Sequence, residues 1–390
     1  QLLPRVTVRS WEVIARELFT LANGHDPRVA RPTQVASALT AAISSTGLQG
    51  FSERFLMSEW VNAIDAWQLR SLEAYQAVRR IGRRSGLGAR QRERLWPVFD
   101  TVRQTLERQH VLTWSMIFEQ VAQHYRNSSS KPFTHVIVDE AQDLGVPELR
   151  MLSAIIEDRP NALFLAGDLG QRIFREPFSW RELGVDVRGR STTLKVNYRT
   201  SHQIRKAADR LLPAAIRDAD GNEEERSGTV SIFNGPAPML RPCESEEDET
   251  QAVAAWLMQA TADGIEPDEI GVFVRHEGLL SRARTAVSQA DATVMEISDR
   301  PEETDGRVSV GTMHMAKGLE FKSVVVMACD DEELPLQSRM ETASDGSEID
   351  EIFDTERRLF YVACTRARDR LMVSGVAPVS DFFADFDETD

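Results

Sequence analysis

Residues 134–143, THVIVDEAQD, and residues 162–171, ALFLAGDLGQ, decide the fold of this chain. Each stretch begins with a short apolar run and ends in polar residues, and a helical pattern at 147–157 lies between them. Strand, helix and strand joined by short loops predict a parallel α/β unit. Functional residues of such sheets gather at the carboxyl ends of the strands, which is where DEAQD and GDLGQ lie.

The same alternation recurs downstream and predicts a second α/β domain. Its apolar strand patterns and helical patterns are, in chain order, 270–274, 278–290, 308–311, 324–328, 351–366 and 371–373. A helix is expected at 201–213, and the acidic stretches at 217–226 and 243–250 are expected to be loops. The acidic last ten residues are expected to fray.

The first 130 residues are predicted to be mostly helical. Trp11, Ile14, Ala15, Leu18 and Phe19 follow the spacing of an amphipathic helix, and similar spacing recurs around 58–82 and 99–125. Four arginines gather within this region, at Arg79, Arg80, Arg83 and Arg84. They form either a solvated helix face or a surface that contacts the phosphate backbone of DNA.

Composition excludes several classes of protein. The chain has 390 residues, 42% hydrophobic and 27% charged, with a formal net charge of −15. No apolar run approaches the roughly 18 residues of a membrane span, and no signal-peptide pattern is present. Cys243, Cys329 and Cys364 lack the paired spacing of a disulfide scaffold or a structural zinc site. We therefore expect a cytoplasmic protein without a membrane partner.

The acid pair Asp139 and Glu140 suits a magnesium–triphosphate site at the end of a buried strand. One carboxylate could hold the metal while the other polarises an attacking water. Gln171, after the next strand, could hydrogen-bond a terminal phosphate or position water. The alternative for each is an ordinary solvated side chain.

Arg199, in NYRT at 197–200, and Arg366, in YVACTR at 361–366, each stand beside the end of an expected element. A planar, permanently charged guanidinium suits a phosphoryl group. Either arginine alone could instead form a surface salt bridge. The segment TMHMAKGLEF at 312–321 adds a histidine, a lysine and a glutamate, which gain meaning only from the other motifs.

Taken together and in order, these segments resemble the superfamily 1 helicases of the UvrD/Rep/PcrA type. The matching stretches are VDEAQD, GDLGQRIF, LKVNYRTS, VGTMHMAKGLEF and ERRLFYVACTRARDRL. The resemblance covers about 135–215 and 268–375, and VTVRSWEVIAREL at 6–18 is a weaker match. It implies an α/β fold of two RecA-like, parallel-sheet domains that sandwich ATP, the first incomplete at its N-terminus and carrying a helical insert.

The resemblance also implies a role for each matching residue. Asp139 would serve Mg²⁺ together with a phosphate-loop Ser or Thr, and Glu140 would activate the hydrolytic water. Gln171, Arg199 and Arg366 would contact the γ-phosphate. Tyr198 would stack on adenine, while Glu320 and Gly318 would lie at the nucleotide. Thr312 and His314 would contact DNA.

An aromatic side chain near GDLGQRIF would stack on a base, since stacking tolerates any sequence. The candidates are Phe174, Phe178 and Trp180, and their alternative role is core packing. The resemblance thus predicts ATP and Mg²⁺ as cofactors and single-stranded DNA, or a junction of single and double strands, as partner. It further implies 3′ to 5′ movement, a role in repair or recombination, and a bacterial, nucleoid-associated location.

Three departures qualify the resemblance. No lysine follows a glycine, so the Gly-Lys-Ser/Thr phosphate loop is missing; we expect an upstream segment to carry it and this chain alone to be inactive. GDLGQRIF replaces a more acidic family pattern. Between Ile297 and Arg307 only a loop fits, so the large insertion of the second domain is expected to be absent.

These expectations give a domain scheme and two functional alternatives. The scheme is a remnant of the first RecA-like domain at 1–20, a helical insert at 21–130, the rest of the first domain at 131–200, the second domain at 201–380 and an acidic tail at 381–390. The alternatives to a helicase or translocase are a catalytically silent scaffold that binds DNA or protein, and the motor portion of a larger nuclease or effector machine.

Overall fold

The computed structural model describes residues 5–78, 86–173, 178–213, 215–217, 220–221, 223–225, 228–298, 306–341 and 346–386. The chain forms two compact units. The described residues of the first unit lie within 1–168, 174–191 and 218–222, and those of the second within 169–173, 192–217 and 223–390. The finer scheme of five segments stays a prediction.

Helices dominate the first unit, as the hydrophobic periodicity predicts. They are α1 (Trp11–Asn23), α2 (Pro32–Thr46), α3 (Glu53–Glu59), a π-helical stretch (Trp60–Asp65), α4 (Leu72–Ala77), α5 (Ala89–Arg108), α6 (Trp114–Arg126) and α7 (Val146–Ile155). Helix α1 begins where the Ser10 hydroxyl accepts a hydrogen bond from the Val13 N–H. Its expected apolar stripe buries Ala15, Leu18 and Phe19.

Strands β1 (Val136–Val138) and β2 (Leu163–Leu165) pair in parallel, with α7 between them in the chain. The predicted strand–helix–strand unit is therefore confirmed. The expectation that β1 is buried is wrong for part of the strand, since Ile137 is 77% exposed while Val138 is 7% exposed. Side chains of a strand alternate between two faces, and α1, α6 and α7 cover only one face of this pair.

The second unit is built on a six-stranded sheet in which every neighbouring pair is parallel. Its spatial order is β7 (Met239–Cys243), β12 (Ala367–Val376), β11 (Phe321–Val326), β8 (Ile270–Val274), β10 (Val308–Thr312) and β9 (Val294–Glu296). All five residues of β8 are buried, which is typical of a strand covered on both faces. The chain is therefore an α/β protein with parallel sheets, as predicted.

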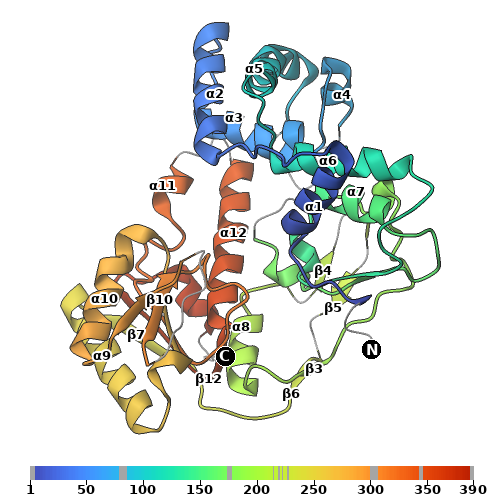
Figure 1. Ribbon diagram of the computed structural model, residues 1–390. Helices are drawn as coiled ribbons and strands as arrows, with labels where there is room; N and C mark the ends of the chain where they lie inside the picture. Colours follow the sequence, from blue (N-terminus) through green and yellow to red (C-terminus); the bar gives the residue numbers. More distant parts are fainter. Residues whose placement is uncertain are drawn as a thin grey trace. The chain divides into compact units, whose positions relative to one another are not determined.

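Helices cover both faces of this sheet (Figure 1). Helices α9 (Glu246–Ala262) and α10 (Leu280–Gln289) pack on one face, against Val272 and Val325. Helices α8 (His202–Asp209) and α12 (Gly346–Cys364) pack on the other, against Phe273 and Val324. Neighbouring residues of one strand thus face different helices, and the central strand β8, IGVFV, is apolar throughout.

Four short strands and a short helix complete the second unit. Strands β3 (Val196–Asn197) and β6 (Val230–Ser231) pair in parallel, and β4 (Ala215–Arg217) and β5 (Glu223–Glu225) pair antiparallel. Helix α11 (Gln337–Met340) precedes α12. The stretch at 217–226 was expected to be a loop, and its strand β5 corrects that expectation.

Two further expectations about acidic stretches are wrong. Residues 243–250 are not a loop, because α9 begins at Glu246 behind the N-cap Ser245. Acidic side chains in a first turn complement the partial positive charge of the helix N-terminus, so these acids favour the helix. Asp381–Phe386 does not fray but forms a 3₁₀-helix that buries Phe382, Phe383 and Phe386.

Within the described ranges, no helix has the length and apolar character that a membrane crossing requires. The three cysteines are free and buried. Burial raises the pKa of Cys329 and Cys364 well above the usual thiol range, so both stay protonated at neutral pH.

Candidate functional site

The loop after β1 holds the predicted acid pair. Asp139 is exposed and Glu140 is half-buried. The backbone of Glu140 is left-handed, with φ 53° and ψ 39°, a region that residues other than glycine seldom occupy. The Glu140 N–H donates to Asp139 Oδ1 at 2.9 Å, and the Asp143 N–H donates to the Glu140 carbonyl at 2.9 Å. Strained backbone of this kind often accompanies function.

A third member of the DEAQD segment, Gln142, was not singled out from the sequence. It is 4% exposed, and its side-chain Nε2 donates to Glu140 Oε2. Its Oε1 accepts the Asp168 N–H at 3.0 Å. The Ala141 N–H donates to the Ala166 carbonyl at 2.8 Å, so the loops after β1 and β2 are joined by both backbone and side chain.

The β1 loop has the donor chemistry of a magnesium site that depends on phosphate. Mg²⁺ prefers oxygen ligands and often binds through one or two carboxylates, with water and substrate phosphates as the other ligands. The exposed carboxylate of Asp139 fits that part. Among the residues that the structure describes, no three His, Cys, Asp or Glu side chains could hold a metal ion by themselves.

In the second unit, the segment that carries Gln171 is held by cationic side chains. Gln171 ends a 3₁₀ turn (Leu169–Gln171), and its Oε1 accepts a hydrogen bond from Arg366 Nη2 at 3.1 Å. Lys317 Nζ donates to the Gln171 carbonyl at 3.0 Å. Arg366 is 1% exposed and also donates to the carbonyls of Val362 and Leu319. Gln171 and Arg366, both predicted to contact the γ-phosphate, are thus hydrogen-bonded to each other.

The other predicted nucleotide contacts of the second unit also lie together. Arg199 Nε and Glu320 Oε2 form an ion pair at 2.7 Å, with both side chains about half-exposed. Asn197 Oδ1 accepts the Arg199 N–H at 2.8 Å and so shapes the turn that presents the arginine. Tyr198 is 71% exposed, available for stacking. Gly318 has φ +80°, which favours glycine at this position.

The predicted DNA contacts of the second unit follow β10. Thr312 is buried at the strand end, and His314 lies at the surface beyond it. Partial desolvation, with the cation of Arg275 adding to it, lowers the pKa of His314. The imidazole is therefore neutral at neutral pH. Arg275 itself is buried and forms a bidentate ion pair with Glu356 of α12.

The remaining predicted DNA contacts are placed only in part. Phe178 and Trp180 are partly buried against the core of the first unit, which fits their alternative role in packing. The backbone N–H of Trp180 donates to Asp220 Oδ2 at 2.8 Å. The predicted contacts Phe174, Arg79, Arg80, Arg83 and Arg84 lie outside the described residues.

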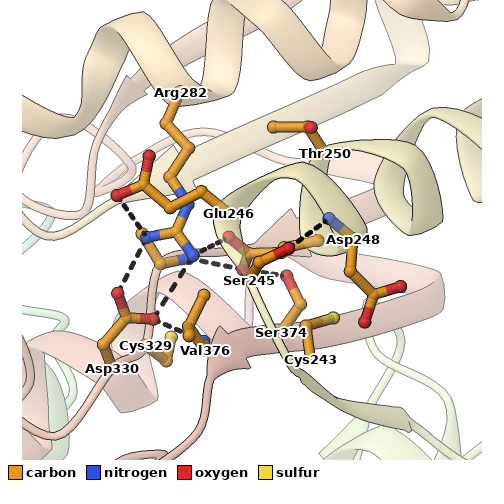
Figure 2. Close-up of polar contacts among 12 residues, drawn as sticks. Cys243, Ser245, Glu246, Asp248, Thr250, Arg282, Cys329, Asp330, Ser374 and Val376 are labelled. Carbon is orange, nitrogen blue, oxygen red and sulfur yellow. Dashed lines mark hydrogen bonds and ion pairs between the residues drawn. The ribbon is translucent and has the colours of Figure 1, made fainter.

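A cluster of charged side chains in the second unit has a structural role (Figure 2). Arg282 of α10 pairs with Glu249 of α9, and its Nη1 lies 2.7 Å from Asp330 Oδ2. Ser374 Oγ donates to Glu249 Oε1 at 2.6 Å, and the Val376 N–H donates to Asp330 Oδ1 at 2.6 Å. Burial raises the pKa of Glu249, an effect that the Arg282 cation opposes. The cluster thus joins two helices to the sheet.

Two family models match the chain. The model described as the UvrD/REP helicase N-terminal domain matches residues 25–182, and that of the UvrD-like helicase C-terminal domain matches residues 285–377. The order of the two models along the chain is the order of the two compact units.

Curated proteins and a solved structure are also similar. A probable DNA helicase from Mycoplasma pneumoniae is 28% identical over 62% of this chain and 44% of its own length. The ATP-dependent DNA helicase UvrD2 from Mycobacterium bovis is 23% identical over 61% of this chain and 47% of its own. The chain therefore spans a little under half the length of these relatives. The C-terminal domain of a possible DNA helicase from Lactobacillus plantarum WCFS1 matches at 18% identity and a TM-score of 0.35, covering 49% of this chain and 95% of that one.

Proposed function

Since the chain belongs to the UvrD/Rep-type helicases of superfamily 1, we propose that it is a motor portion of an ATP-dependent DNA helicase or translocase. The motor acts on single-stranded DNA, moves 3′ to 5′, and works in DNA repair or recombination in the bacterial cytoplasm. ATP and Mg²⁺ are its cofactors. The domain scheme of two RecA-like domains with a helical insert belongs to the same proposal.

The observation that carries the proposal is the conformation of Glu140. A half-buried carboxylate on a left-handed backbone, fixed by Asp139, Asp143 and Gln142, is the kind of pre-organised group that general-base catalysis requires. Glu140 would take a proton from the attacking water. Asp139 would contribute one ligand to Mg²⁺, which when bound would neutralise charge on the phosphates.

Residues of the second unit complete the proposed chemistry. Gln171, Arg199 and Arg366 contact the γ-phosphate, Tyr198 stacks on adenine, and Glu320 and Gly318 lie at the nucleotide. The ion pair of Arg199 with Glu320 and the hydrogen bond of Arg366 to Gln171 support this assignment, because residues proposed for one ligand lie in contact.

The proposed DNA contacts come from the end of β10 and the turn after it, and from the segments at 79–84 and 174–180. Thr312 and His314 follow one strand end, and a neutral His314 could donate or accept a hydrogen bond without adding charge. Phe178 and Trp180 would stack on bases only with the exposed part of their rings. Phe174 and the four arginines of the insert stay sequence-based proposals.

Glu140→Gln in the complete protein that contains this chain tests the function. The amide keeps the shape of the side chain but cannot accept a proton, so we expect ATP turnover to fall by about 10²- to 10⁴-fold. ATP binding, measured with a fluorescent analogue, should stay within about twofold. Glu157→Gln is the matched control, since Glu157 is a surface residue of the same unit that pairs with Arg159. Unchanged turnover in Glu140→Gln would overturn the assignment and favour a silent scaffold.

A further inference from the structure

The side-chain amide of Gln142 is engaged at both ends. Its nitrogen donates to the Glu140 carboxylate, and its oxygen accepts the Asp168 N–H from the loop after β2. An amide is an uncharged group that can donate at one end and accept at the other at a fixed orientation. Because Gln142 is 4% exposed, water does not readily replace either partner.

The neighbouring Gly167 leaves room for this amide. A Cβ at position 167 would lie 2.4 Å from Gln142 Oε1 and 3.1 Å from the backbone nitrogens of Ala141 and Gln142. A side chain there would therefore push the amide away from its two partners. The reason for the glycine is close approach, since no positive φ is involved.

We propose that Gln142 is a positioning residue that fixes the carboxylate of Glu140 for proton transfer, with Gly167 as the residue that makes its position possible. This inference rests on the proposed role of Glu140 as general base. The turn around Glu140 holds its backbone, whereas Gln142 is the one residue in the described part of the chain that is seen to hold its carboxylate oxygen. With Oε2 held, the orientation of the other oxygen is set as well, and a displacement of about 1 Å at a reacting group can lower a rate by about 10²-fold.

The donor end of the amide is the part that matters for Glu140. In Gln142→Glu the carboxylate could still accept the Asp168 N–H, but it would stand against Glu140 without a hydrogen to donate. Two like charges in contact repel, so the carboxylate of Glu140 would turn away from the orientation that Gln142 fixes. Asp139, Asp143 and Asp168 are the other acidic groups of these two loops, and all three are unchanged in the variant.

Steady-state ATP turnover by the complete protein with single-stranded DNA tests the inference. For Gln142→Glu we expect kcat to fall about 10- to 100-fold and KM for ATP to change less than about twofold. Gln123→Glu is the matched control, because Gln123 of α6 likewise donates to a glutamate, Glu119, at 3.1 Å. It should leave both kcat and KM unchanged.

A double-mutant cycle with Gly167 separates positioning from general damage. Gly167→Ala should lower kcat about as much as Gln142→Leu. The double variant should lose clearly less than the sum of the two single losses, because the methyl group has no amide left to displace and keeps only its contacts at 3.1 Å with the backbone nitrogens of Ala141 and Gln142.

Three results would contradict the inference and leave the proposed function intact. Additive losses in the cycle would overturn it, as would unchanged kcat in Gln142→Glu. A loss of kcat that tracks a loss of folded protein would reduce Gln142 to a structural role. Absence of ATP turnover in the wild-type protein would overturn the proposed function itself, and this inference with it.

Discussion

At the scale of single residues, the side chain of Gln142 links the acid pair of DEAQD to the loop after β2. Two carboxylates after an apolar run indicate a strand-end site from the sequence alone. The contact of Gln142 with Asp168 joins residues 26 positions apart. No spacing rule predicts such a contact, because it depends on the parallel pairing of β1 with β2 and on a glycine at 167.

Asp65 gives a prediction about stability at the same scale. It ends the π-helical stretch of the first unit, and burial raises its pKa to about 6, although Thr113, Ser115 and Gln68 donate hydrogen bonds to it. The pKa of Asp65 in the folded chain lies above the unfolded value of 3.8. The contribution of Asp65 to the free energy of unfolding is therefore fully present below about pH 4 and is lost as the pH rises through 6. Asp65→Asn should remove this loss and stabilise the chain at pH 7.5 by about 3 kcal/mol.

Urea unfolding of the wild type and the variant at pH 4, 5, 6 and 7.5 measures this effect, with hydrogen exchange in α6 as a local probe. Asp158→Asn is the control, since Asp158 is exposed. Parallel pH dependence in wild type and Asp65→Asn would show that Asp65 does not titrate in this range.

At the scale of elements, the central strands of the large sheet were predicted, whereas its edge strands β7 and β9 and the structure of the acidic segments were missed. The pattern at 270–274 coincides with β8, and that at 308–311 with most of β10. Helix α9 was missed because four acids in a row were interpreted as a solvated loop, although the same acids favour a helix N-terminus behind Ser245. The C-terminal 3₁₀-helix was missed because the prediction was based on the acidic residues of the segment and not on its three phenylalanines, which are buried in the core.

The cluster around Arg282 should hold α9 and α10 on the sheet. Arg282→Met would leave Glu249 buried without its cation, which is expected to destabilise the second unit by about 3–5 kcal/mol. The loss should be smaller at pH 5 than at pH 8, because a buried carboxylate without its cation readily takes up a proton. Urea unfolding at both pH values measures the difference.

Arg284 provides a matched control on the same helix. It pairs with Glu296 at 3.0 Å, but both side chains are 47% exposed, so Arg284→Met should cost less than about 1 kcal/mol. If Arg282→Met and Arg284→Met lowered the free energy of unfolding equally, burial of the Arg282 cluster would contribute nothing to the stability of the unit.

At the scale of the whole molecule, the order of the motifs is more informative than any one of them. Each motif alone could be an ordinary turn, yet together they predicted the family that the two domain models identify. The α/β class followed from strand and helix patterns and is confirmed by the parallel sheets. The one-sided covering of β1 and the roles of Lys317 and Gln142 were not predicted, since they depend on which side chains meet after folding.

The most direct test of the central claim is directed movement on DNA. The complete protein that contains this chain would be given oligonucleotides with streptavidin bound to a biotin at either the 3′ or the 5′ end, with and without ATP. The account predicts that streptavidin is displaced faster from the 5′ end, in the presence of ATP, and that Glu140→Gln abolishes the displacement. Hydrolysis of ATP without displacement from either end, or displacement that Glu140→Gln leaves intact, would contradict it.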